Sequence, residues 1–422
     1  MKMLRIGICA LVVFAVAAHG GVEDWARAVI ETGAGLLFLV WALWIFFNPE
    51  EQPVFSPLLP PLAALSLIVL GQWFFHRTAS SHSTRIELLL LLANLIVLFL
   101  AVQAFRTLRD WRGFVWFGMG FGFVVSIFGI LQHLTFNGEL YWFREMRYGG
   151  IPFGPYVNRN HFAGFVELVL PLSLVPLVLG RVRRERWPVV SLFAVVPISA
   201  LFLSASRGGI VSFGVELAVL AFAVVLRRTK GKQLLTGAAV LLLALLMVSW
   251  LGVGQILQRF SSLQSLETTA GKRASMRRDT WRIFLDHPVA GTGLGTLQIV
   301  YPPYETLYDG KIVNHTHNDY LEALAETGLL GGLCCGWFVV VLLRVSFKRL
   351  RQVGNSFAGA LQLSGLVAAS GFLVHSLVDF NLHIPSNAFL FFLMAHLATA
   401  EIQQITSAST APVQRYRNPR NP

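Results

Sequence analysis

The chain has 422 residues, of which 55% are hydrophobic and only 13% are charged, and its mean hydropathy is +0.61. Soluble globular proteins carry about 25% charged residues, so this composition excludes most soluble enzymes and disordered proteins. The formal net charge is +12. In so apolar a chain this excess indicates membrane orientation or an anionic substrate, and we expect no nucleic-acid partner.

Apolar segments of roughly 16 to 21 residues recur along the chain, close to the ~20 residues that an α-helix needs to cross a membrane. Backbone amides in lipid must be paired within their own segment, so we expect helices. The sequence predicts an all-α polytopic membrane protein, with a transmembrane domain over 1–403 and a short basic tail over 404–422. About twelve spans are expected, over 4–19, 29–47, 57–75, 86–105, 114–134, 161–180, 188–203, 209–226, 234–252, 329–345, 358–378 and 387–403.

Lysine and arginine residues cluster in alternate connections between the predicted spans. With twelve spans, all these clusters fall on one side, and the positive-inside rule makes that side the cytoplasm. We therefore expect a multi-pass membrane protein with both termini in the cytoplasm. The first segment also resembles a signal peptide with a small-residue cleavage site, but we favour an uncleaved span. The clusters lie at 2–5, 106–112, 181–186, 227–232, 344–351 and 415–420.

A loop of about 75 residues, 253–328, separates the ninth and tenth predicted spans on the outer side. Loops of this length are usually functional. Arginine forks match phosphate oxygens bidentately, so its basic residues favour a site for a phosphate-bearing substrate. A solvated basic surface or contact with lipid headgroups is the alternative. These residues are Arg259, Lys272, Arg273, Arg277, Arg278, Arg282 and Lys311.

The first part of this loop predicts a helix over 274–286 that ends at His287-Pro288. A run of alternating glycines, 291–295, follows it. No Gly-Lys-Ser/Thr comes after these glycines, so a tight turn is favoured over a phosphate loop.

The second part, 315–328, contains the sharpest motif. Asp319 and Glu322 have the spacing of an N-cap and a capping box, and Gly328 is typical of a helix stop. His317 would then precede a helix N-terminus, whose positive end disfavours the imidazolium. A neutral histidine at that place is suited to general-base chemistry.

The residues alone leave other interpretations of this motif open. His315 and His317 could ligate a metal with Asp319, but the spacing is not that of a helical zinc site, and we expect no metal. Either histidine could form a structural hydrogen bond, and the helix could be an interfacial entry into the next span. The three cysteines lie in apolar runs and form no disulfide framework: Cys9, Cys334 and Cys335.

Charged residues also lie at the outer ends of predicted spans. Arg207 sits in a short turn, where it is either an interfacial anchor or a cation facing a cavity, with the two glycines after it letting a ligand approach the backbone. Arg159 and His161 lie at the outer start of the sixth span. Asp379 and His383 precede the last span and are candidates to pair with these arginines.

Three motifs resemble the O-antigen ligase and polymerase superfamily of bacterial envelope glycosyltransferases, and most closely the O-antigen ligases. His317-Asn318, nine residues and then Gly328-Leu-Leu-Gly is similar to the ligase pattern of His-Asn, nine residues and Gly-x-x-Gly. Ser206-Arg207-Gly208 resembles the arginine at the outer end of a mid-chain span. Residues 273–297 resemble an arginine-rich segment before a proline and a glycine run. One departure is that many relatives have Arg-x-x-x-Trp, where this chain has Arg273-Ala-Ser-Met-Arg277.

This resemblance implies a metal-independent enzyme without a cofactor, whose periplasmic catalytic loop is 253–328. It would move a glycan from undecaprenyl pyrophosphate to an acceptor such as lipid A-core, with inversion. His317 would be the general base, with Arg207, Arg273 and Arg278 on the pyrophosphate, because fixed arginines stabilise that charge without a metal. Further candidates for substrate binding are Arg159, His161, Arg277, His315 and Asn318.

Other functions remain open at this point. A polymerase would use the same donor with a lipid-linked glycan as acceptor. A protein O-glycosyltransferase usually has more sequence after its last span than the 404–422 tail found here. A lipid or solute transporter would place charges in the middle of its spans, whereas the acidic residues there are scattered: Glu87, Glu167 and Glu216.

Overall fold

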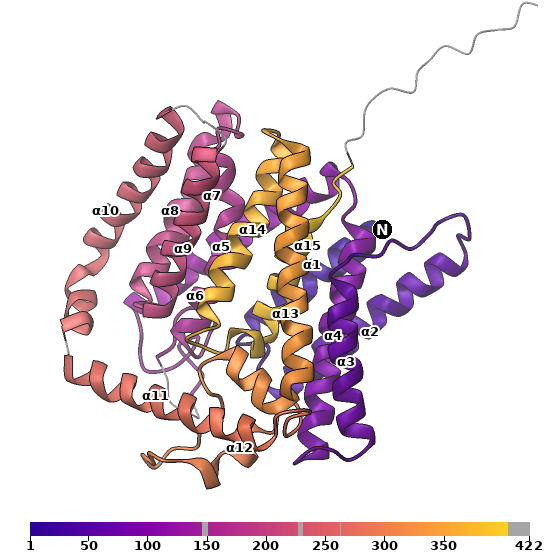
Figure 1. Ribbon diagram of the computed structural model, residues 1–422. Coiled ribbons are helices and arrows are strands. Elements are labelled where there is room, and N and C mark those ends of the chain that lie inside the picture. Colours follow the sequence, from indigo (N-terminus) through magenta and orange to yellow (C-terminus); the bar gives the residue numbers. More distant parts are fainter. Residues whose placement is uncertain (146–150, 227–230, 262, 404–422) are drawn as a thin grey trace, which may run out of the picture.

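The computed structural model describes residues 1–145, 151–226, 231–261 and 263–403, so the predicted basic tail over 404–422 lies outside it. Within these ranges the regular elements are α-helices and short 3-10 helices, with isolated bridges and no strand (Figure 1). The prediction of an all-α protein is confirmed.

A helix covers each of the twelve predicted membrane segments. Eight helical stretches of the described chain are long and apolar enough to cross a membrane, so a multi-pass membrane protein is supported, while the count of twelve spans stays a prediction. The helices over these segments are α1 Lys2–Ala17, α2 Asp24–Phe46, α3 Leu59–Phe74, α4 Ser81–Ala104, α5 Leu108–Leu134, α6 Arg159–Val169 with α7 Pro171–Val178, α8 Trp187–Leu203, α9 Arg207–Leu226, α10 Gly231–Ser261, α13 Asp319–Val353, α14 Phe357–His375 and α15 Pro385–Thr399.

The remaining elements belong to the connections. The helix expected over 274–286 is present as α11, which ends before His287-Pro288 as predicted but begins earlier. These elements are η1 Arg184–Arg186, α11 Leu263–Asp286, α12 Leu297–Val300, η2 Pro302–Tyr304 and η3 Asn381–His383.

Four of the six basic clusters, at 2–5, 106–112, 181–186 and 344–351, lie at one end of the bundle, which we call the basic end, whereas those at 227–232 and 415–420 fall wholly or partly outside the described residues. Arg5 pairs with Asp110 there, the amide of Leu108 donates to the carbonyl of Gln403 at 3.2 Å, and Arg349 lies 3.0 Å from Glu401. The N-terminus and the described end of the chain share this end (Figure 1). For these four clusters, the predicted gathering of basic connections on one side is therefore present in the geometry.

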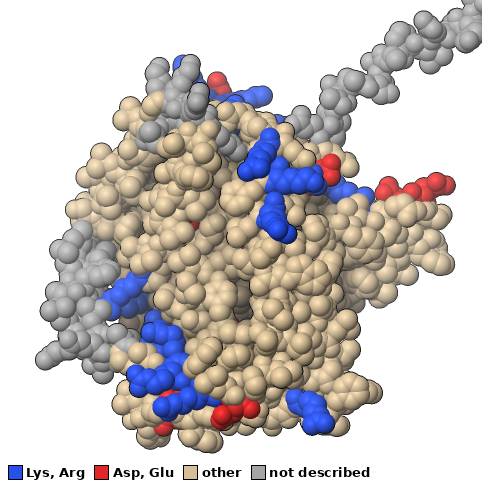
Figure 2. Space-filling model, viewed as in Figure 1, with Lys and Arg blue, Asp and Glu red and all other residues tan. Residues whose placement is uncertain are grey.

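Between its two ends the molecule presents apolar side chains to its surroundings. On the face shown in Figure 2, basic groups gather toward the two ends, and the band between them is mostly uncharged. Large hydrophobic side chains along the helices are exposed, among them Leu36, Leu67, Val124, Val211 and Leu333. A surface of this kind is expected for a protein embedded in lipid.

The centre of the bundle is formed by α14 and α15, whose residues are almost all buried. Helix α14 packs against α6, α7, α9, α13 and α15. Close helix contact through Gly118 and Gly122 is predicted by their spacing and is confirmed, because a Cβ at either glycine would lie within 2.6 or 2.7 Å of Leu172 or Val169.

A second, smaller core lies at the end opposite the basic end, which we call the site end. Here α11 packs against η2 and α13, and α12 packs against the same two elements, burying Met276, Ile283, Leu297, Tyr301 and Ala325. The buried carboxylate of Asp279 accepts hydrogen bonds from Tyr301 and from the amide and hydroxyl of Thr306. This core fixes α11 across the site end of the bundle (Figure 1).

Helix α13 is kinked at Gly328, which has a left-handed backbone with φ of +64°. The expected stop at this glycine is confirmed, because its backbone is not helical and a second helical segment begins after it and runs to Val353. The amide of Leu329 donates to Pro288 at 2.8 Å, and that of Gly293 donates to Glu326 at 2.8 Å. The 291–295 glycine run thus forms a tight turn docked on the kink, which confirms the structural interpretation of that motif.

Replacing Gly328 with alanine should destabilise the protein, because a Cβ there would lie 2.3 Å from the carbonyl oxygen of Val289 and the backbone is left-handed. We expect a loss of about 2 kcal/mol or more, measured as a lower thermal unfolding midpoint in detergent. Gly336→Ala in the same helix is the matched control, since a Cβ there meets nothing within 4 Å. Equal midpoints for the two variants would contradict the packing described.

Candidate active site

His317 lies in the connection just before α13, with a left-handed φ of +54°. The helix N-cap is Asn318, whose Oδ1 accepts from the amide of Leu321 at 2.9 Å. The expectation that Asp319 is the cap and Glu322 completes a capping box is wrong. Asp319 is the first helical residue, and the Glu322 carboxylate is taken by other partners.

The ring of His317 is held by a buried carboxylate rather than by the helix end alone. Its Nδ1 lies 3.1 Å from Oδ1 of Asp379, with the histidine side chain 24% exposed and the aspartate 1% exposed. A carboxylate only accepts hydrogen bonds, so Nδ1 must donate, and the lone pair of the neutral ring is then on Nε2. Asp379 therefore selects the tautomer that can accept a proton at Nε2.

Asp379 is itself held by a chain of polar groups from two other helices. The Nδ2 of Asn160 donates to its second oxygen, and Ser206 donates to Oδ1 of Asn160 at 2.9 Å. Although burial disfavours a carboxylate, the hydrogen bond from His317 and the nearby imidazoles hold the pKa of Asp379 well below its usual range. The aspartate is thus an anion at neutral pH, and the chain links the starts of α6, α9 and α13.

Phe380 packs at the centre of the candidate histidines. Its ring centroid lies 4.8 Å from that of His161, 4.3 Å from His315 and 5.0 Å from His317. His161 is buried, with Nε2 4.0 Å from Oδ1 of Asp379. The 376–384 connection, which sequence reasoning treated as a minor flank, is therefore the floor of the site.

Two of the arginines assigned to the pyrophosphate adjoin this chain of hydrogen bonds, and Arg159 directly precedes Asn160 at the start of α6. Arg273 of α11 donates from Nη1 to the carbonyl of Val378 at 3.2 Å, one residue from Asp379. Arg207 follows Ser206 directly and is exposed at the start of α9. The expectation that Asp379 pairs with an arginine is not met among the described residues, because its charged partners there are His317 and His161.

The glycines after Arg207 serve helix packing. A Cβ on Gly208 would lie 2.8 Å from Nε2 of His375 in α14, and one on Gly209 would lie 2.6 Å from Ala163 in α6. They let three helices approach closely beneath Arg207, so the expectation that they admit a ligand to the backbone is not supported.

The arginines of α11 point in different directions. Met276, Asp279 and Thr280 are buried on one face, and Thr280 meets Thr316 at 3.2 Å, beside His317. At 100° per residue, Arg273 and Arg277 flank this buried face, whereas Arg278 projects from the opposite side and is exposed. The helix therefore presents Arg273, and not Arg278, toward the Asp379 connection.

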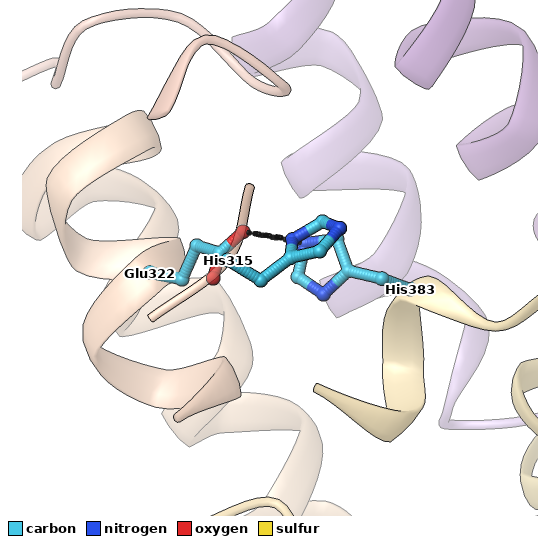
Figure 3. A group of neighbouring side chains, drawn as sticks. All are labelled: His315, Glu322 and His383. Atoms are coloured by element: carbon cyan, nitrogen blue, oxygen red, sulfur yellow. Dashed lines mark hydrogen bonds and ion pairs between the residues drawn. The ribbon is translucent and has the colours of Figure 1, made fainter. Parts of the chain in front are cut away.

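His315 belongs to a separate cluster with Glu322 and His383 (Figure 3). The Nδ1 of His315 lies 2.6 Å from Oε1 of Glu322, and Nε2 of His383 lies 3.4 Å from the same oxygen. The amide of Thr316 donates to Oε2 of Glu322 at 2.8 Å. This buried glutamate ties the loop carrying His317 to α13 and η3.

Donor atoms of these three residues lie within 4.8 Å of one another, so their types and spacing could hold a divalent metal. The metal ligands considered from sequence were instead His315, His317 and Asp319, and the structure does not bring those together, since His317 turns to Asp379.

His383 also bonds Asp319 through Nδ1, at 2.9 Å. Burial disfavours the imidazolium, but the carboxylates of Glu322 and Asp319 outweigh it and raise the pKa of His383 to about 10. A cationic His383 between two carboxylates holds η3 against the first turn of α13.

Sequence reasoning missed the groups that position His317. Asp379 was noted only as a possible arginine partner, Asn160 was passed over beside Arg159 and His161, and Glu322 was assigned to a cap. The available signal was an acid in an apolar stretch between the last two predicted spans, since such a residue must find a partner.

Comparison with known families supports the sequence resemblance. A family model described as O-antigen ligase matches residues 192–336, a segment that runs from α8 into α13 and includes Arg207, Arg273 and His317. The resemblance to the O-antigen ligase and polymerase superfamily is thereby confirmed. No curated protein matches the chain.

Proposed function

We propose that this chain, whose residues 192–336 match the O-antigen ligase family, transfers a glycan from undecaprenyl pyrophosphate to an acceptor at the periplasmic face of the inner membrane. An O-antigen ligase that uses lipid A-core is the leading form of this proposal. The observation that carries it is a histidine whose Nδ1 is held at 3.1 Å by a buried aspartate, beside two arginines that adjoin the same chain of hydrogen bonds.

The base in this proposal is His317. Its Nε2 takes the proton of the acceptor hydroxyl as that oxygen attacks the anomeric carbon. Asp379 stabilises the imidazolium that forms, because it stays ionised and bonds Nδ1. The new glycosidic bond forms on the face opposite the departing phosphate oxygen, so the configuration inverts.

The leaving group is undecaprenyl pyrophosphate, on which negative charge builds as its bond to the sugar breaks. We assign Arg207 and Arg273 to its phosphate oxygens, because they belong to two elements that meet at the Asp379 chain. Guanidinium groups fixed before the reaction stabilise such charge without reorganising. Arg278 is a weaker candidate, since it projects from the far side of α11.

The other candidates act in this scheme mainly as positioning residues. Asn318 caps α13 and donates from Nδ2 to the carbonyl of Leu377 at 3.0 Å. His161 packs on Phe380, and His315 bonds Glu322. Arg159 at the start of α6 and Arg277 beside Arg273 are candidates for contact with the glycan.

The proposed orientation places the basic end in the cytoplasm and the site end, with 253–328, in the periplasm. The separation of basic connections from the His317 site supports this placement. The carrier's apolar tail would lie against the exposed hydrophobic side chains along the helices.

A transporter is less well supported by the described charges within predicted spans. Glu87 pairs with Arg27 at 2.6 Å, and Glu167 pairs with His375 at 2.9 Å. These two acids therefore have partners between packed helices, which is typical of a structural role, whereas the carboxylate of the third, Glu216 of α9, is buried without a hydrogen-bond partner among the described residues.

Incubating the purified protein with an undecaprenyl-pyrophosphate glycan tests the proposal. With lipid A-core as the acceptor, we expect the glycan to appear on lipid A-core and the carrier to be released. Mass spectrometry measures both products. With a second lipid-linked glycan as the only acceptor, a polymerase would instead yield longer lipid-linked chains. No product with either acceptor would contradict the proposed transfer.

Substituting His317 or Asp379 should slow glycan transfer without unfolding the protein. We expect His317→Ala to lower kcat by about 10²- to 10⁴-fold, because general-base catalysis contributes that much. Asp379→Asn should lower kcat by about 10²-fold or more with a smaller change in KM, since the asparagine no longer selects the tautomer. His287→Ala, an exposed histidine at the end of α11, is the control. Full activity of His317→Ala protein would overturn the assignment.

The arginines of α11 should differ in their effects. We expect Arg273→Ala to lower kcat/KM by about 10²-fold or more, because a charge on the pyrophosphate is lost, and Arg278→Ala to cause a clearly smaller loss. Arg282→Ala is the control, since that side chain is exposed beside Asp279. A larger effect of Arg278→Ala would move the pyrophosphate to the other face of α11.

A further inference from the structure

A cavity of about 280 Å³ opens at the basic end of the bundle, far from the His317 site along the helices. It lies between α5, α7, the start of α8 and the start of α14. Four arginines line it, namely Arg112, Arg181, Arg183 and Arg186. All its other lining residues are apolar or aromatic, so no acidic side chain of the described residues faces the cavity.

Two of these arginines are held in place by aromatic rings. The guanidinium of Arg112 lies 5.3 Å from the ring centroid of Phe357, and that of Arg186 lies 5.4 Å from the ring of Trp116. None of the four forms an ion pair with a carboxylate among the described residues. Positive charge is therefore concentrated at the cavity without an acidic partner within that part of the chain.

The lining changes character with depth. Along α5, Arg112 is followed by Val115, Trp116 and Met119, which line the same cavity one to two turns further into the bundle. Leu172 and Pro176 of α7 face it as well. Charge lies at the mouth and apolar surface lies below it, an arrangement that matches an amphiphile whose head is anionic and whose chain is a hydrocarbon.

We propose that this cavity binds an anionic phospholipid, phosphatidylglycerol or cardiolipin, from the membrane leaflet at the basic end. Arginine forks match the oxygens of the headgroup phosphate, and basic pockets between transmembrane helices are known to suit such lipids. One acyl chain would follow the apolar lining along α5 and α7. The lipid would thereby join α5 to the α7–α8 connection and to α14.

The positive-inside rule explains why arginines lie at this end of the bundle. It does not explain why four of them line the same cavity. Arg184, in the same connection, is exposed and does not line the cavity. The inference concerns the opposite end from the transfer site and does not depend on glycan chemistry.

Binding is measured with the full-length protein purified in detergent and stripped of lipid. Phosphatidylglycerol, cardiolipin and phosphatidylethanolamine are titrated separately and followed by native mass spectrometry and by the thermal unfolding midpoint. We expect the two anionic lipids to bind and to raise the midpoint, and phosphatidylethanolamine to do neither. Equal behaviour of all three lipids, or equal stabilisation by inorganic phosphate alone, would overturn the proposal.

Two double variants separate the cavity from general charge. Arg181→Gln with Arg183→Gln removes two lining arginines, and Arg184→Gln with Lys348→Gln removes two exposed charges from the same end. We expect the lining variant to bind anionic lipid at least tenfold more weakly and the matched control to bind as the unmodified protein does. An equal loss of lipid binding in both variants would contradict the proposal, because it would show that the lipid is attracted by general positive charge and not by the cavity. No glycan is present, so failure here leaves the proposed transfer untouched.

Discussion

The hydrogen bond between His317 and Asp379 follows from the burial of a charge. The Asp379 carboxylate is 1% exposed, and a carboxylate can be buried as an anion only if it is paired. Its partners come from three places in the chain, with Asn160 at the start of α6, His317 before α13 and the backbone amide of Phe380. Ser206 extends the chain of hydrogen bonds to α9. Burying one charge therefore brings the ends of four membrane helices to a common point.

The loop across this point needs its own support, because its buried backbone amides cannot bond water and must be paired within the protein. Asp279 accepts from Tyr301 and Thr306, and Glu322 accepts from the amide of Thr316. The Glu326 carboxylate likewise accepts from the amides of Gly295 and Leu297 at 2.9 and 2.8 Å. Three buried acids thus replace water as acceptors, and they hold α11 and its arginines over the histidine.

Local patterns predicted the helices well, because apolar length and the need for paired amides act within one segment. The end of α11 before His287-Pro288 and the close contact at Gly118 are of this kind. Pairings distant in sequence were out of reach. The contact of His317 with Asp379 spans 62 residues, and nothing local shows whether an acid will meet an arginine or an imidazole. Glu322 was assigned wrongly for another reason: its spacing fits a capping box, but its carboxylate bonds His315 and the amide of Thr316 just before the helix and lies beside His383.

The arginines show why position decides chemistry more than residue type does. Arg273 and Arg278 are five residues apart on one helix, yet one bonds the Val378 carbonyl and the other faces outward. At the basic end, Arg183 lines a cavity while its neighbour Arg184 does not. A guanidinium recognises phosphate best where the surrounding structure fixes its position and places no carboxylate close enough to compete for it. Each end of the bundle provides such a setting in a different way. At the site end, Arg273 and Arg207 adjoin the hydrogen bonds around His317 and Asp379. At the basic end, the arginines line a cavity that is apolar further in, and aromatic rings pack against two of them.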